Sequence, residues 1–356
     1  MPHATLPDAA VDDLQRATGA DWPTLQAGRR RAAGKRAELA AAVAGLSGGD
    51  TGVVVFGSLA RDEFGGESDI DWTLLVDGPA DPGHLDLAHR IAAEVDRLGR
   101  PPGREGTFGS LAFSHELIHK IGGEDDTNSN TTRRILLLLE SAPVGRRDAY
   151  DRVVGNVLRR YLDEDRGLWT GSGRPKVPRF LLNDISRYWR TMLVDFTYKQ
   201  ASRAGRGWAL RNIKLRTSRK LIFLAGLLTC FSPLLDLDDD DAHRIFGPER
   251  DLPRLLAHLE RRVAASPLDL LAHALLAEGH LEAGRAMFDA YEEFLALIGD
   301  PERRGRLAAL TYERLGDDPV FAEGRRIAND FQQAVGAVFL DPATRLGRLT
   351  IEYGIF

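Results

Sequence analysis

The stretch from Phe56 to Val76, FGSLARDEFGGESDIDWTLLV, decides how this chain of 356 residues is interpreted. Just before it, Thr51 to Phe56 (TGVVVF) is β-branched, almost wholly apolar and preceded by glycines, which predicts a buried strand. Asp69 to Val76 (DIDWTLLV) predicts a second strand, which the turn residues Asp77 and Gly78 end. A polar loop with two glycines joins the two strands.

The polar groups of this stretch have the chemistry of a phosphate and metal site. Residues two apart in a strand project from the same face, so Asp69 and Asp71 form a carboxylate pair that can share a divalent cation. Gly57 lets a phosphate approach the backbone, and Ser58 can hydrogen-bond it from its side chain and main chain. Arg61 is a further candidate for a phosphate contact. Since Mg²⁺ binds through a few carboxylates plus substrate phosphates, the stretch predicts a nucleoside triphosphate site that uses Mg²⁺ or Mn²⁺.

These residues resemble the signature of the DNA-polymerase-β-type nucleotidyltransferase superfamily. In that pattern a Gly-Ser ends one strand and an Asp-x-Asp lies on the next, as Gly57-Ser58 and Asp69-Ile70-Asp71 do here. The segment from Glu116 to Gly122, followed by a loop and a helix ending in LLLLES, is also similar to bacterial PII-protein uridylyltransferases. The resemblance implies transfer of a nucleoside monophosphate to an acceptor hydroxyl, with release of pyrophosphate.

The resemblance also implies a third metal-binding carboxylate on a neighbouring strand. We favour Glu116, which a strand over Thr107 to Ile121 would carry, although the uridylyltransferases have Asp there. The other acidic candidates are Glu105, Glu124, Asp125 and Asp126.

A second motif overlaps the same residues. His115-Glu116-Leu117-Ile118-His119 matches H-E-x-x-H, which on a helix places two imidazoles on one face for zinc, and Glu140 could be a third ligand. Gly122 and Gly123 cut the segment short, and the preceding alternation favours a strand. In a strand the two histidines would lie roughly 13 Å apart, too far for one zinc ion. A zinc metalloprotease is therefore a minor alternative.

The rest of the chain predicts an α+β protein, with a small mixed-sheet nucleotidyltransferase domain followed by a larger all-helical region. Helical patterns cover residues 8–47 and 85–98, and after Thr131 the pattern stays helical, with helices near 146–164, 178–200 and 207–231. We expect an N-terminal helical segment at 1–50, the catalytic domain at 51–142, and a helical substrate-binding or accessory domain at 143–356.

The helical region offers further candidates for nucleotide contacts. Arg187 and Arg190 lie on one face of a predicted helix, and Lys214 lies in the basic stretch from Arg203 to Lys220. This stretch could bind a triphosphate or an acidic or RNA substrate. Amphipathic packing and a solvated helix face explain the same residues equally well.

Composition limits the partners. A formal net charge of -5 disfavours RNA. We expect the acceptor to be a protein side chain. An RNA 3′ end, as in a tRNA-directed or toxin-like enzyme, and a small hydroxylated molecule stay open. So does a different class of protein, a catalytically dead nucleotide-sensing module. The oligomeric state is not predictable from these features.

We expect a cytoplasmic protein without a membrane partner. The single cysteine, Cys230, cannot form an internal disulfide and lies in an apolar run, which fits a reducing compartment. The first residues do not have the pattern of a signal peptide. The most apolar run, Leu221 to Leu235, is too short to span a bilayer and contains Pro233, so it predicts a buried helix.

Overall fold

The structure is a computed structural model that describes residues 9–103, 107–202 and 207–354, without the side chains of 199–202. The chain divides into two compact units. The first contains Met1–Gln26, Ile185–Leu235 and Pro267–Phe356, and the second contains Ala27–Asp184 and Asp236–Ser266. Each unit is therefore built from separate parts of the chain.

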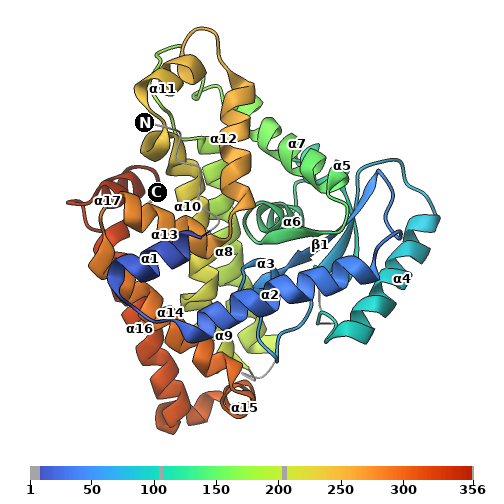
Figure 1. The fold of residues 1–356 in the computed structure, drawn as a ribbon, viewed down its shortest axis with the longest axis vertical. Helices are drawn as coiled ribbons and strands as arrows, with labels where there is room; N and C mark the ends of the chain where they lie inside the picture. Colours follow the sequence, from blue (N-terminus) through green and yellow to red (C-terminus); the bar gives the residue numbers. More distant parts are fainter. Residues whose placement is uncertain (1–8, 104–106, 203–206, 355–356) are drawn as a thin grey trace. The chain divides into compact units, whose positions relative to one another are not determined.

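The second unit is built around a four-stranded sheet, whose strand β1 is labelled in Figure 1. The strand order is β3-β2-β1-β4. The strands are β1 (Thr51–Phe56), β2 (Trp72–Val76), β3 (Ser110–Phe113) and β4 (Ser141–Val144). β1 pairs antiparallel with both β2 and β4, whereas β2 and β3 run parallel. The sheet is therefore mixed, and the predicted α+β class is confirmed.

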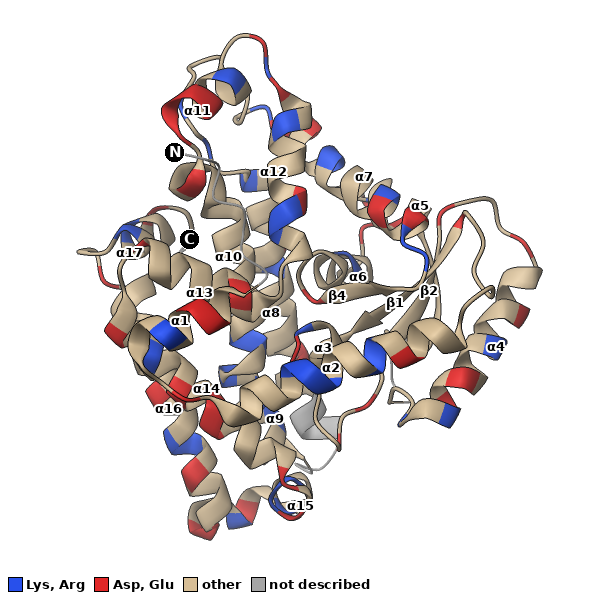
Figure 2. Cartoon of the chain, in the orientation of Figure 1, with Lys and Arg blue, Asp and Glu red and all other residues tan. Residues whose placement is uncertain are grey.

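One face of this sheet carries the main apolar core of the unit. Alternate residues of β1 and β2, such as Val53, Trp72 and Leu74, pack with α2 (Pro23–Ala42) and α4 (Gly83–Leu98). These side chains are at most 2% exposed, so water is excluded from this face. Figure 2 shows Lys and Arg along α2; Arg31 and Lys35 bond the backbone carbonyls of Phe64 and Leu98.

The remaining elements of the second unit are helical. The segment α3 (Gly57–Ala60) follows β1, α5 (Ser114–Ile118) follows β3, and α6 (Asn128–Leu139) leads into β4. α7 (Asp148–Glu164) contacts β1 and α12 (Leu252–Ala264). The unit also contains α11 (Asp239–Phe246) and the first residues of α8 (Arg179–Ser202).

The first unit is helical throughout its described residues. Its most extensive contact joins α14 (Leu281–Gly299) to α16 (Pro319–Phe339), and α1 (Ala10–Thr18) packs on α13 (Pro267–Ala277). Its other elements, besides most of α8, are α9 (Trp208–Arg216), α10 (Ser218–Asp236), α15 (Pro301–Ala309), the 3₁₀ segment η1 (Tyr312–Asp317), α17 (Arg345–Leu349) and the π segment η2 (Thr350–Gly354).

Two predicted helices are each divided in the structure. The helix expected over 8–47 is interrupted after α1 by Gly19, which has a left-handed φ of 62° and caps that helix. The helix expected over 207–231 is interrupted at Thr217, between α9 and α10. Both breaks are local backbone events within otherwise continuous helical patterns.

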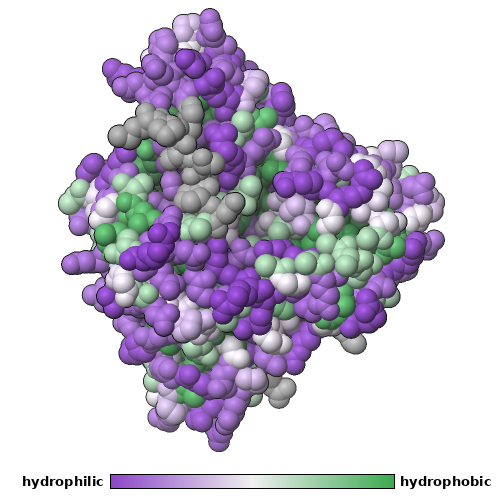
Figure 3. All heavy atoms as spheres, in the orientation of Figure 1, coloured by the Kyte–Doolittle hydropathy of each residue, from purple (hydrophilic) through white to green (hydrophobic). Residues whose placement is uncertain are grey.

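The most apolar helical stretch is long enough to cross a membrane by length and composition. It runs over Trp208–Asp236, but 72% of its most apolar window is buried inside the protein, as in the core helix of a globular domain. Pro233 lies inside α10, as expected. The molecular face drawn in Figure 3 is mainly hydrophilic, with smaller apolar areas between the polar side chains.

Candidate active site

Gly57 and Asp71 are in direct contact at one end of the sheet. Gly57 follows β1 with a φ of 66°, a left-handed conformation that favours glycine. A Cβ atom at this position would lie 2.8 Å from Oδ2 of Asp71, too close for any other residue without movement. The strands are joined here as well, because Phe56 N–H donates to the Asp71 carbonyl over 2.9 Å. The Gly57-Ser58 turn and the Asp71 carboxylate are therefore brought together.

Asp69 and Asp71 leave the sheet on the same side. Between them Ile70 is fully buried among the apolar residues of the α2 and α4 face. Since successive side chains in an extended chain point to opposite faces, the two aspartates project to the other face. Ile70 N–H donates to the Arg100 carbonyl over 2.8 Å, which fixes the extended conformation before β2 begins at Trp72. Asp69 is exposed and Asp71 is half-buried.

Glu116 is not near the two aspartates. In the parallel pairing Thr73 lies beside Ser110, and Val76 lies beside Phe113. Asp71 precedes this ladder, whereas Glu116 follows it, so roughly 16 Å of strand separates the two ends. The predicted strand over Glu116 was wrong: the residue lies on α5 and pairs with Lys120, 3.6 Å away.

The other acidic candidates do not complete a metal triad in the described residues. Glu124 and Asp125 are exposed, and Asp126 is buried in an ion pair with Arg134. Glu105 lies outside the described residues. Within the described ranges no three His, Cys, Asp or Glu side chains form a group that could hold a metal ion. The described metal donors are thus the two aspartates, which suits Mg²⁺ because this ion binds through one or two carboxylates plus substrate phosphates.

The H-E-x-x-H motif is helical, contrary to our prediction. His119 N–H donates to the His115 carbonyl over 3.0 Å, and the two ring centroids are 4.9 Å apart. This helix, α5, packs against α6 and α7, and an alternation pattern cannot reveal such contacts. Glu140, the candidate third ligand, is buried in an ion pair with Arg61. A zinc site therefore lacks a third protein ligand among the described groups.

Arg61 does not face a phosphate site. Its side chain is 8% exposed, and its guanidinium forms ion pairs with Glu63 and Glu140. Two buried carboxylates already satisfy this cation, so it fixes the chain after α3 to the end of α6. The predicted phosphate contact through Arg61 is corrected to a structural ion pair.

Three predicted nucleotide contacts belong to the other compact unit. Arg187 and Lys214 are half-buried, and Arg190 is exposed. Their role stays a prediction. Part of the basic stretch around Lys214 is used within that unit: Arg216 donates to Gln332, and burial lowers the pKa of Lys220. Arg203 to Arg206 lie outside the described residues.

A buried charge network centred on Arg134 was not predicted from the sequence. Arg134 of α6 is fully buried and donates to Asp126 over 2.9 Å and to Asp184 over 2.6 Å. The Tyr161 hydroxyl accepts from Arg134 and donates to Asp184. Burial opposes the charge of Arg134, but Tyr161, Asp126 and Asp184 together raise its pKa above the usual value. The sequence signal was the Arg133-Arg134 doublet directly before the apolar run ILLLL.

Comparison with known proteins agrees with this geometry. Residues 37–103 match the family model of the nucleotidyltransferase domain, a range that includes β1, α3, β2 and α4. This part of the chain is therefore similar to a nucleotidyltransferase domain. Among curated proteins, none matches the chain.

Proposed function

We propose that this protein transfers a nucleoside monophosphate from a nucleoside triphosphate to an acceptor hydroxyl, and that the acceptor is a protein side chain. The observation that supports this most strongly is the contact between Gly57 and the Asp71 carboxylate, which lies only 2.8 Å from where a Cβ atom on Gly57 would be, within the matched domain. At this contact the backbone of Gly57, which a phosphate can approach, lies beside the carboxylate of Asp71, which can hold a cation.

The proposed roles follow from the position of each group. Asp69 and Asp71 would hold Mg²⁺ or Mn²⁺, and Gly57 and Ser58 would bind the β- and γ-phosphates. When bound, the metal neutralises charge on the triphosphate and the leaving pyrophosphate. The acceptor oxygen attacks the α-phosphorus, a new P–O bond forms, and the bond from the α-phosphorus to the bridging oxygen breaks. The acceptor proton passes to an aspartate or to water.

A labelling experiment tests the proposal. The purified protein is incubated with Mg²⁺, a cell extract and each α-³²P-labelled nucleoside triphosphate in turn. We expect a labelled protein band and release of pyrophosphate. A labelled RNA would instead support the RNA-directed alternative, and nucleotide binding without transfer would support the sensor.

Two variants make the experiment specific. Asp69→Asn with Asp71→Asn should abolish labelling, because both proposed metal ligands lose their charge. Asp77→Asn is the matched control, since Asp77 follows the same strand at its other end and pairs there with Arg152. Labelling that survives in the double variant would contradict the proposed mechanism.

A further inference from the structure

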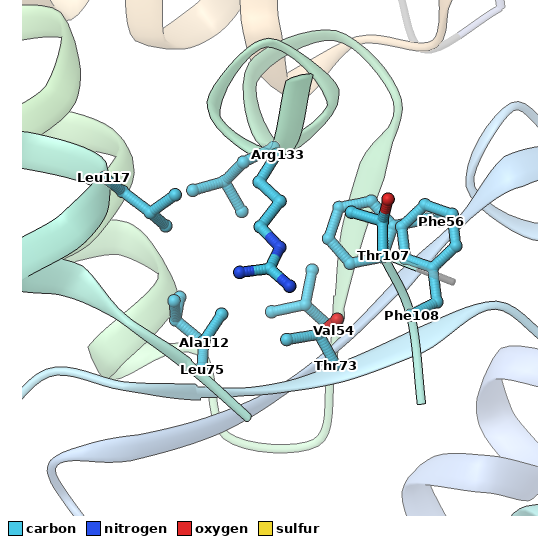
Figure 4. Close-up of a pocket in the computed structure, with 10 residues that line it drawn as sticks. Val54, Phe56, Thr73, Leu75, Thr107, Phe108, Ala112, Leu117 and Arg133 are labelled. Carbon is cyan, nitrogen blue, oxygen red and sulfur yellow. The ribbon is translucent and has the colours of Figure 1, made fainter. Parts of the chain in front are cut away.

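A pocket on the aspartate face of the sheet contains an arginine, Arg133, for which the described residues supply no ion-pair partner. Its floor is formed by Val54, Phe56, Thr73 and Leu75, which alternate along β1 and β2. Asp71 precedes Thr73 by two residues and therefore projects to the same face. Figure 4 shows Arg133 extending from α6 toward this floor.

The environment of Arg133 is mostly apolar. Its Nε atom is buried and has no hydrogen-bond partner within the described ranges. The lining residues include the aromatic pair Phe56 and Phe108, whose ring centroids are 4.8 Å apart, and the apolar side chains of Leu117 and Leu137. The only hydroxyls among the described lining residues are those of Thr73 and Thr107. The empty space of about 330 Å³ includes open solvent at the mouth, and the cavity itself is about 20 Å³.

The guanidinium of Arg133 in this apolar pocket would be stabilised by an anion from a bound ligand. A guanidinium stays charged and has five N–H donors, so its partial burial without a partner is unfavourable. Its neighbour Arg134 has two aspartates, and Arg61 has two glutamates. The Nε atom of Arg133 has no hydrogen-bond partner in the described part of the chain, whereas Arg134 and Arg61 both form ion pairs. This contrast points to a ligand rather than to a missing structural contact.

We propose that the pocket binds a carboxylate of the acceptor, with Arg133 as its counter-ion and the apolar walls around the adjacent carbon atoms. This inference rests on the proposed function, because it makes the pocket the place where the acceptor is held beside Asp69 and Asp71. A carboxylate fits better than a phosphate, since most of the wall is apolar and phosphate is more strongly hydrated. On a protein acceptor, the group is an Asp or Glu side chain near the modified hydroxyl.

Calorimetric titration with small probes tests the charge requirement without any activity. Acetate, butyrate and benzoate are compared with acetamide, butyramide and benzamide, in the presence of Mg²⁺. We expect the carboxylates to bind and their uncharged amides to bind at least tenfold more weakly. Each added methylene that enters the pocket should strengthen binding roughly fourfold. Equal binding of acids and amides would overturn the proposal.

Variants then locate the binding. Arg133→Met should weaken benzoate roughly 10- to 100-fold, because a charge-assisted hydrogen bond is lost, whereas Arg133→Lys should retain part of the affinity. The melting temperature of Arg133→Met should stay near that of the natural protein, since the substitution strands no carboxylate in the described structure. Benzoate binding unchanged in Arg133→Met would overturn the proposal. If Arg133→Met does not fold, the affinity of Arg133→Lys and the comparison of acids with amides still test whether the pocket binds a carboxylate.

Other probes separate the sources of the ligand. Blocked Tyr-Glu and Tyr-Gln dipeptides test a protein acceptor: Arg133-dependent preference for the Glu peptide supports it, whereas preference for benzoate alone supports a small carboxylic acid. The remaining probes are inorganic phosphate and the uncharged nucleosides uridine and adenosine. If any of them binds more tightly than benzoate, and this binding depends on Arg133, the carboxylate assignment is overturned.

The outcome is separable from that of the proposed function. Asp69→Asn with Asp71→Asn should lose transfer but keep benzoate binding. If the natural protein transfers nucleotide but does not bind carboxylates, only the pocket proposal is contradicted. If it binds carboxylates but does not transfer nucleotide, only the proposed function is contradicted.

Discussion

The two faces of the β1–β2 ladder differ in what they hold. One face packs Val53, Val55, Trp72 and Leu74 against α2 and α4, and these side chains are at most 2% exposed. The other face has Asp71 at its edge and Thr73 in its interior, and Arg133 of α6 lines the pocket there. Neighbouring residues of one strand therefore serve stability and chemistry separately.

This separation follows from the period of two in a strand. A change on the apolar face should alter the free energy of unfolding and leave ligand binding intact. A change on the other face should do the reverse, except at charges that are already paired inside the protein. The following predictions test this division, from the largest expected effect on stability to the smallest.

Arg134→Met should be the most destabilising change. It leaves the buried Asp126 and Asp184 without their cation, and breaking a buried ion pair costs about 3–5 kcal/mol. The measurement is urea unfolding. The neighbouring Arg133→Met, which breaks no ion pair of the described residues, is the matched control. Equal losses in both variants would contradict the contrast between the two arginines.

Leu74→Ala should lower the free energy of unfolding by about 2–5 kcal/mol, because Leu74 is fully buried on the apolar face. Thr73→Val, one residue away on the other face, should cost about 1 kcal/mol or less. Unfolding and benzoate titration are measured on both. If Thr73→Val proves the more destabilising of the two, the two faces do not divide as described.

Because His258 of α12 is buried, we expect the free energy of unfolding to fall in acid. Burial and the charge of Arg262 lower its pKa to about 4, from 6.5. His258 is therefore protonated below about pH 6.5 in the unfolded chain, but only below about pH 4 in the folded protein. Stability from this group is complete above pH 6.5 and falls by about 3 kcal/mol as the pH decreases to 4.

The check is unfolding at pH 7 and pH 4 of the natural protein and of His258→Gln. The variant should lose about 3 kcal/mol less between the two pH values. An identical pH dependence would show that His258 does not titrate in this range on unfolding.

Gly57→Ala should have a modest effect on stability but a large effect on activity. A left-handed alanine costs about 1–2 kcal/mol, and the new Cβ would displace the Asp71 carboxylate. A shift of about 1 Å at a reacting centre can reduce the rate about 100-fold. Gly45→Ala is the matched control, since Gly45 has a φ of 78° with no described atom within 4 Å of the added carbon.

Both variants are compared in melting temperature and nucleotide transfer. They should lose similar stability, and only Gly57→Ala should lose transfer. Full activity in Gly57→Ala would mean that the contact with Asp71 is unimportant.

The part of the site that the sequence predicted depends on short distances along the chain. Gly57, Ser58, Asp69 and Asp71 were placed together because strand alternation and a tight turn are local. The helical conformation of His115 to His119 was missed, since this segment packs against the distant helices α6 and α7.

The charges that were misassigned depend on distant partners. Arg61 pairs with Glu140, which is 79 residues away, and this contact has no local signature. Likewise, only the folded chain distinguishes Arg134, which is paired with Asp184, from Arg133, for which the described residues supply no counter-ion. The sequence shows that Arg133 and Arg134 are adjacent, but it does not show that their side chains have different partners.

The most direct test of the central claim is a count of bound Mn²⁺ by electron paramagnetic resonance, with α,β-methylene ATP or UTP as a non-reacting nucleotide. The natural protein and Asp77→Asn should bind about one or two ions per chain only when a nucleotide is present. Asp69→Asn with Asp71→Asn should bind none. Equal Mn²⁺ binding by this double variant would contradict the assignment of the aspartate pair as the metal site.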